Sequence, residues 1–100
     1  MLTSKQRAQL KGIASTADTI LIVGKGGITE NVVIQAKDAL AKREIIKGKV
    51  LETSLLTAKE AVEALSELCD AEPVQFIGSK FVLYKENKKL DKEKRIKLVK

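Results

Sequence analysis

The sequence contains no histidine and no tryptophan, and it has one cysteine, Cys69, and one proline. The absence of histidine excludes a Cys/His zinc site, a Ser–His–Asp triad and a histidine general base. A single cysteine excludes an internal disulfide and is typical of a reducing compartment. Carboxylates remain available for acid–base catalysis, but no spaced pair of them indicates an active site. We therefore expect a non-enzymatic protein that has no cofactor and no metal ion.

Aromatic residues and long apolar runs are also scarce. The three aromatic residues are Phe76, Phe81 and Tyr84, so stacking of bases on aromatic rings is excluded as the main mode of any nucleic-acid recognition. We expect Phe76 and Phe81 in the core. No apolar run is long enough to span a membrane, and the N-terminal segment MLTSKQRAQL lacks the apolar core of a signal peptide. We expect a cytoplasmic protein with no membrane partner.

Positive charge is in excess and unevenly distributed. The chain has 19 Lys and Arg residues against 13 acidic residues, a net charge of +6, which favours a polyanionic partner. Residues 57–72 hold one lysine and five acidic residues, so this segment should face away from a polyanion. Residues 85–100 hold eight basic and three acidic residues. We interpret residues 1–85 as one domain and residues 86–100 as a mobile basic tail.

Capping residues and apolar periodicity predict helices at residues 3–17, 29–43 and 57–69, and strands at 19–23, 44–52, 74–77 and 80–85. This order, α-β-α-β-α-β-β, predicts a single compact α/β domain. A β-α-β unit should be a right-handed crossover with parallel strands. A terminal hairpin around Gly78-Ser79 should add antiparallel pairing, giving a four-stranded mixed sheet with helices packed on it.

The helical spacing also predicts which side chains are buried. We expect the strand at residues 19–23 to be buried, and Gly48 to mark a bulge or a twist in the second strand. The first helix should bury Leu10, Ile13, Ala14 and Ala17, and the third should bury Ala58, Ala61, Val62, Leu65, Leu68 and Cys69.

The segment ILIVGKGGITENVV at residues 20–34 places three glycines and a lysine between a strand and a helix. A P-loop is excluded, because Lys25 stands between glycines and no Ser or Thr follows it at the metal-binding position. A dinucleotide fingerprint fits Gly24 and Gly26 but has Thr29 at its third glycine, although Glu44 stands where a ribose-binding acid is expected. A third possibility is a G-x-x-G loop that lets a nucleic-acid backbone approach its amides, as in KH domains. The alternative is a tight turn that needs a positive φ angle.

The same glycines belong to a longer ordered set of residues that resembles the YhbY-like family, or CRM domain, named for chloroplast RNA splicing and ribosome maturation. The resemblance covers residues 2–85 and rests on these segments: Leu2-Thr3-x-Lys5-Gln6-Arg7, Ile22-x-Gly24-Lys25-x-Gly27-Ile28-Thr29, Ala39-Leu40, Glu44-Ile45-Ile46-Lys47, Ala71-x-x-Val74-Gln75-x-Ile77-Gly78 and Val82-Leu83-Tyr84. The chain departs from the family at Arg43, where histidine is common, and at Ala17-Asp18, where many members have proline.

The resemblance implies an RNA-binding domain similar in fold to the C-terminal domain of bacterial initiation factor three. It implies contact between RNA and the G-x-x-G loop, and an association with precursors of the large ribosomal subunit. We expect a monomer that binds structured rRNA mostly through its backbone and shape. The candidate RNA contacts are glycines of the loop and basic residues outside the acidic segment: Gly24, Lys25, Gly26, Gly27, Lys5, Arg7, Lys11, Lys42, Arg43 and Lys47.

Two other functions stay open. The glycine loop suits a small phosphate- or nucleotide-binding module, which Lys25→Ala should inactivate. The acidic third helix suits a protein-binding adaptor, whose partner would survive nuclease treatment.

Overall fold

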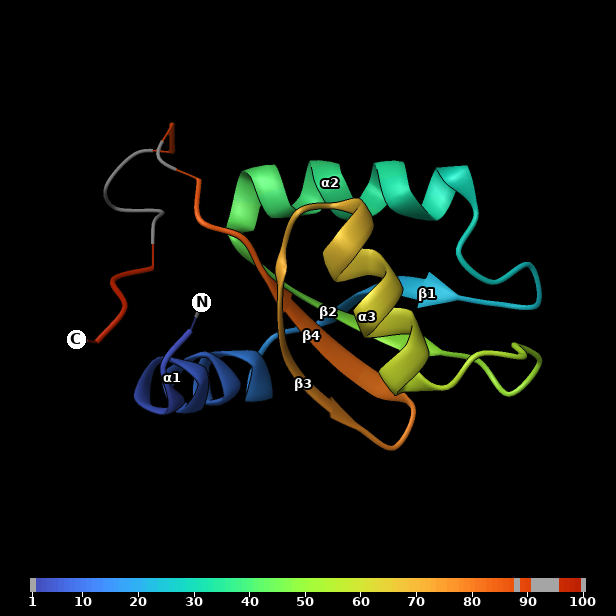
Figure 1. The fold of residues 1–100 in the computed structure, drawn as a ribbon, viewed down its shortest axis with the longest axis horizontal. Helices are drawn as coiled ribbons and strands as arrows, with labels where there is room; N and C mark the ends of the chain where they lie inside the picture. Colours follow the sequence, from blue (N-terminus) through green and yellow to red (C-terminus); the bar gives the residue numbers. More distant parts are fainter. Residues whose placement is uncertain (1, 88, 91–95, 100) are drawn as a thin grey trace.

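The structure is a computed structural model that describes residues 2–87, 89–90 and 96–99. Seven elements follow in the predicted order, which confirms the α-β-α-β-α-β-β arrangement (Figure 1). They are α1 (Ser4–Ser15), β1 (Thr19–Val23), α2 (Glu30–Arg43), β2 (Ile45–Val50), α3 (Ala58–Leu68), β3 (Glu72–Ile77) and β4 (Lys80–Tyr84).

The four strands form one mixed sheet in the order β1-β2-β4-β3. β1 and β2 are parallel and α2 connects them, whereas β4 pairs antiparallel with both β2 and β3. The predicted mixed sheet and terminal hairpin are confirmed. β1 and β3 are the two edges, and Pro73 lies in the edge strand β3, where its missing N–H removes no bond from the sheet interior.

Helices pack on both faces of the sheet, but unequally. On one face, which we call the covered face, α2 and α3 bury a large core that includes Leu21, Ile46 and Phe81. On the other, which we call the open face, α1 packs alone and buries a smaller cluster of Leu10, Ala14, Val74, Val82 and Tyr84. Figure 1 shows α1 at one end of the sheet, so the other end of the open face has no helix over it.

Predicted caps fix the starts of the helices. Thr3 and Thr57 form capping boxes with Gln6 and Glu60, as the sequence predicts, and each threonine hydroxyl accepts a hydrogen bond of 3.1 Å. Thr29 caps α2 by accepting from the N–H of Val32 at 3.3 Å.

Several burial predictions are wrong, and the residues concerned lie on the two edge strands or at the margins of helices. The strand at residues 19–23 is half buried, because β1 is an edge strand and its outer face carries Ile22, which is 54% exposed. Ile13 and Leu68 lie at the margins of their helical faces and are 37% and 53% exposed. Phe81 lies in the core as predicted, but Phe76 on β3 is 48% exposed. Cys69 is buried as predicted.

Gly48 is needed for packing rather than for a bulge in its own strand. A Cβ atom built on Gly48 would lie 2.2 Å from Cζ of Phe81, so the aromatic ring occupies the space of a side chain. The irregularity lies in β1, where the register with β2 shifts between Thr19 and Leu21. Close packing of Phe81 therefore accounts for the glycine.

The described part of the C-terminal tail packs on the domain, contrary to the predicted mobility. Glu44, at φ 60°, caps the end of α2 in the left-handed conformation and is fully buried. Its carboxylate accepts from the N–H of Asn87 at 2.7 Å and of Ile96 at 2.6 Å. Gln9 of α1 donates to the carbonyl of Lys97 and accepts from the N–H of Val99. Residues 88, 91–95 and 100 of the predicted tail lie outside the described residues.

Candidate nucleic-acid interface

The glycine loop connects β1 to α2 at one end of the molecule (Figure 1). The N–H of Gly27 donates to the carbonyl of Gly24 at 3.0 Å, and the N–H of Thr29 donates to the carbonyl of Gly27 at 3.1 Å. These bonds form a tight turn whose tip, Lys25 and Gly26, is exposed. The exposed Lys25 stands in the loop that leads into the N-terminus of α2, and a cation close to a helix N-terminus favours an anion.

Backbone conformation requires a glycine at only one of the three glycine positions of the turn. Gly27 has φ +70°, a conformation that L side chains rarely adopt. Neither Gly24 nor Gly26 has a positive φ. A Cβ on Gly24 would make an ordinary contact of 3.6 Å with Leu51, and one on Gly26 would lie 3.2 Å from Thr29. The tight-turn alternative therefore explains Gly27 and leaves Gly24 unexplained.

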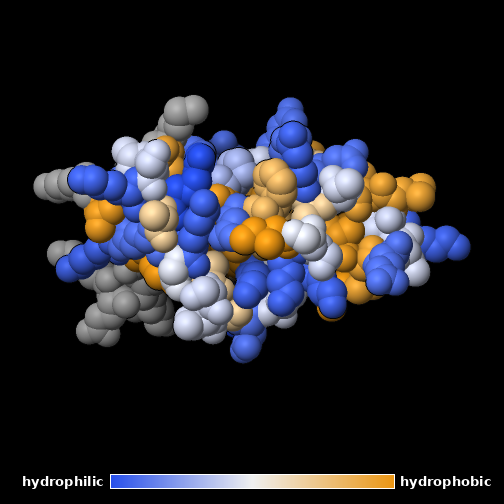
Figure 2. Space-filling view, turned by 90° about the horizontal axis from the view of Figure 1, so that it is seen from below, coloured by the Kyte–Doolittle hydropathy of each residue, from blue (hydrophilic) through white to orange (hydrophobic). Residues whose placement is uncertain are grey.

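A second loop, residues 51–57, lies beside the glycine loop. The N–H of Leu51 donates to the carbonyl of Val23 at 2.9 Å, which joins the two loops at their bases. Leu55 is 96% exposed, and Figure 2 shows apolar surface gathered at this end of the molecule. This apolar surface is not among the features predicted from the sequence. Its signal was the pair Leu55-Leu56 in a segment between a strand and a helix cap, where polar residues are usual.

The other predicted basic contacts fall into two further groups. Lys5, Arg7 and Lys11 lie on α1, and the Nζ atom of Lys47 on β2 donates to the carbonyl of Ala14 at 3.4 Å, which joins Lys47 to that helix. Lys42 and Arg43 end α2, so they lie roughly 20 Å from the glycine loop along the helix axis. The structure therefore does not bring the ten predicted residues into one cluster.

Arg7 is less available to a partner than the exposed lysines of α1. Its side chain is half buried, and its buried Nε atom has no hydrogen-bond partner among the described residues. Arg7 and Lys11 line one cavity with Glu63 of the acidic helix α3. The expectation that the whole acidic helix faces away from the basic surface is thus wrong for Glu63, because α1 and α3 both contact the edge strand β3.

The structure also shows the surroundings of Glu44, Cys69 and the potential metal ligands. Glu44, the ribose-binding candidate of the dinucleotide alternative, is buried beneath the tail and accepts hydrogen bonds from backbone N–H groups. Among the described residues, no group of three or more potential ligand side chains is placed to hold a metal ion. Burial raises the pKa of the Cys69 thiol, with Lys37 and Lys85 acting in the opposite direction. A raised pKa disfavours the reactive thiolate.

No helix in the described part of the chain combines the length and apolar character of a membrane span.

Comparison with known proteins places the chain in a family. The model of the CRS1/YhbY (CRM) domain matches residues 2–85. A Bacillus subtilis protein named "Probable RNA-binding protein YqeI" is 41% identical, over 88% of this chain and 92% of its own length. An "RNA-binding protein" from Haemophilus influenzae is 34% identical, over 84% of this chain and 85% of its own.

A solved structure agrees in fold. A Staphylococcus aureus protein described as a candidate RNA-binding protein has a TM-score of 0.81 and 45% identity, and the likeness covers 99% of this chain and 100% of that one. The similarity to RNA-binding relatives extends over most of the chain and agrees in fold, sequence and family model. The chain belongs to the CRS1/YhbY (CRM) domain family.

Proposed function

We propose that this protein binds RNA without catalysing a reaction, and that its target is structured rRNA in precursors of the large ribosomal subunit. Membership of the CRM family and two relatives named as RNA-binding proteins support RNA as the partner. The net charge of +6 supports a polyanion. We further propose that the protein acts as a ribosome assembly factor, that it is cytoplasmic and that it is a monomer.

One observation carries the assignment of the site to the glycine loop. Gly24 is not required by backbone conformation or by packing, yet the exposed tip next to it carries a lysine and leads into a helix N-terminus. A phosphate that approaches this turn meets backbone N–H groups, the positive end of the helix dipole and the Lys25 ammonium. Glycines at such a position allow the closest approach of a second backbone.

The mode of recognition follows from what the surface offers. Phe81 and Tyr84 are buried, and Phe76 is the exposed aromatic of the described surface. Lysines and arginines without aromatic neighbours contact phosphates and give little information about base sequence. We therefore propose that the protein recognises RNA mainly by backbone and shape, with an affinity that falls steeply as salt concentration rises.

The test is a fluorescence-anisotropy titration of the full chain against a structured large-subunit rRNA fragment over a salt series. The variant Lys25→Ala/Gly26→Asp removes a cation and places a carboxylate at the loop tip. The control is Lys59→Ala/Glu67→Asp on the exposed side of α3, and circular dichroism confirms that each variant folds. We expect that only the loop variant binds RNA more weakly than the wild type, and that its affinity depends less steeply on salt concentration.

Equal binding by the loop variant, the control and the wild type would remove the loop from the site. Competition by a mononucleotide, lost with Lys25→Ala, would instead favour the nucleotide-binding alternative. Tighter binding of small-subunit fragments of equal length would overturn the assignment to the large subunit.

A further inference from the structure

The part of the open face that α1 leaves uncovered carries a row of four exposed side chains, one from each strand. The sheet register pairs Ile22 of β1 with Lys49 of β2, Lys49 with Lys80 of β4, and Lys80 with Ile77 of β3. Ile22 is 54% exposed and Ile77 is 65% exposed. Directly paired residues point to the same face of a sheet, so two lysines stand side by side between two exposed isoleucines.

This row is unfavourable for the isolated protein. Like charges directly opposite each other destabilise a strand pair, and exposed isoleucines gain nothing from burial. The side chains of Lys49 and Lys80 have no hydrogen-bond or ion-pair partner in the part of the chain that the structure describes. A surface of this kind is stabilised by a partner that brings negative charge and covers apolar area.

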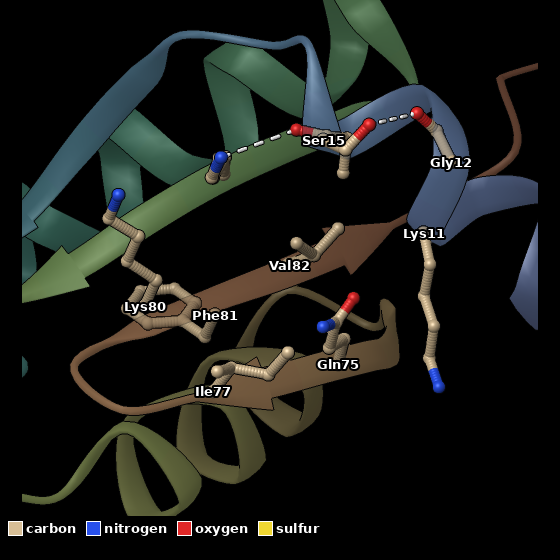
Figure 3. A pocket seen from close by; sticks show the side chains of 10 residues that line it. Lys11, Gly12, Ser15, Gln75, Ile77, Lys80, Phe81 and Val82 are labelled. Carbon is tan, nitrogen blue, oxygen red and sulfur yellow. Dashed lines mark hydrogen bonds between the residues drawn. The ribbon is translucent and has the colours of Figure 1, made fainter.

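A cavity of about 420 Å³ adjoins the row, between the open face and the C-terminal end of α1. Figure 3 shows Lys80 and Lys11 on opposite sides of it, with Gln75, Ile77 and Val82 between them. Lys47 also lines the cavity, and no carboxylate does so among the described residues. The volume lies within the roughly 300–1,000 Å³ typical of pockets for small ligands.

The row also lies close to the glycine loop. Gly24 follows Ile22 by two residues, which is roughly 7 Å along an extended strand. The loop tip, the pair Lys49–Lys80 and the cavity therefore follow one another from the end of the molecule towards α1. A groove of cations that tracks a backbone, next to apolar side chains that receive bases, is the arrangement that binds single-stranded nucleic acid.

We propose that this uncovered part of the open face binds an unpaired segment of the RNA held by the glycine loop. Phosphates of the segment contact Lys49 and Lys80, and one base enters the cavity against Ile77, where the Gln75 amide can both donate and accept a hydrogen bond. Lys11 and Lys47 hold the phosphates on either side of that base. This inference rests on the proposed RNA binding and extends it to residues outside the predicted contact set.

The test uses two RNA probes and two double variants of the full chain. The probes are a blunt-ended hairpin and the same hairpin with a short single-stranded uridine extension. Lys49→Gln/Lys80→Gln removes the paired charges and keeps most of the length of each side chain. Lys37→Gln/Lys59→Gln, on exposed positions of α2 and α3, changes the net charge equally on the opposite side of the sheet.

We expect wild type and control to bind the extended hairpin more tightly than the blunt one. The Lys49→Gln/Lys80→Gln variant should bind the blunt hairpin as the wild type does and lose most of the preference for the extended one. Its salt slope with the extended hairpin should fall by about 1.4, since each phosphate contact on a single strand contributes about 0.7. A 4-thiouridine in the extension should cross-link to the segment 75–82.

The inference is overturned if the variant and its control prefer the extended hairpin to the same degree. It is also overturned if the variant loses binding to an acidic peptide while RNA binding is unchanged, because the row would then serve a protein partner. Failure of the wild type to bind either hairpin would instead refute the proposed function itself, so the two failures are distinguishable.

Discussion

The two faces of the sheet differ in how much of each is covered by helices of the same chain. The covered face has two helices, a continuous core and a glycine whose missing side chain is replaced by the ring of Phe81. The open face has one helix at one end, a smaller core, and two exposed lysines that are neighbours across the sheet at its uncovered end. The buried residues of the covered face are accounted for by packing within the chain. We attribute the exposed residues at the uncovered end of the open face to binding of the proposed RNA partner.

This difference separates stability from function within a chain of 100 residues. The strands alternate between the faces, so Phe81 and Leu83 stabilise the covered core while Lys80 and Val82 belong to the open side. Substitutions on the covered face should therefore change the free energy of unfolding, and substitutions at the uncovered end and the loop should change RNA affinity.

The largest expected effect is on the covered face. Gly48→Ala should lower the free energy of unfolding by about 3 kcal/mol, because its Cβ would overlap the Phe81 ring. The matched substitution Gly12→Ala lies in α1, where a Cβ would meet nothing within 4 Å, and should raise stability by about 0.5–1 kcal/mol. Urea denaturation measures both, and a neutral Gly48→Ala would contradict the packing account.

The next effect concerns the tail on the open side. Glu44→Gln should lower the free energy of unfolding by about 1–3 kcal/mol. The reason is that an NH₂ donor replaces one of the two carboxylate oxygens that accept from Asn87 and Ile96. Limited proteolysis should then cut near the C-terminus sooner than in the wild type. The control is Glu67→Gln at an exposed position of α3, whose free energy of unfolding should stay within about 0.5 kcal/mol of the wild-type value. Equal protease sensitivity of the two variants would mean that Glu44 does not hold the tail.

A smaller effect distinguishes the glycines of the loop. Gly27→Ala should destabilise the fold by about 1–2 kcal/mol, because φ +70° is costly for an L side chain. Gly24→Ala should leave the free energy of unfolding unchanged and weaken RNA binding, because its Cβ fits the fold and obstructs a second backbone. Paired denaturation and anisotropy measurements on both variants test this, and full RNA affinity in Gly24→Ala would count against backbone approach.

The smallest effect belongs to Cys69. Burial raises the pKa of its thiol in the folded state, so the protonated thiol favours folding below the ordinary value of 9.0, and this contribution is lost as pH rises beyond it. Labelling by a disulfide reagent near neutral pH should be slow in the folded protein and fast in denaturant. Rapid labelling of the folded protein would show that the covered core opens at α3.

Much of the fold could be predicted because local signals carry it. The threonine caps, the spacing of apolar residues and the Gly78-Ser79 turn each act within a few residues. The errors have a different origin. Whether Ile22 or Phe76 is buried depends on which strands become edges, and the role of Gly48 depends on Phe81, a residue 33 positions later that pairs with it across the sheet.

The candidate site likewise has one part that local sequence identifies and another that only the fold brings together. The loop was visible from Gly24 to Gly27, because its glycines and lysine are contiguous in the sequence. The row that joins Lys49 to Lys80 was not visible, because only the register of β2 against β4 brings these lysines together. The sequence predicts that Glu44 starts a strand, whereas its hydrogen bonds with Asn87 and Ile96 connect residues at least 43 positions apart.

The most direct test of this account is an NMR titration of ¹⁵N-labelled protein with the large-subunit rRNA fragment. The account predicts that amide shifts concentrate in the glycine loop, at Lys49 and Lys80, and along the C-terminal half of α1. Amides of α3 and of the tail should change little. Shifts confined to α3 or to the tail, with the loop and the open face unchanged, would contradict it.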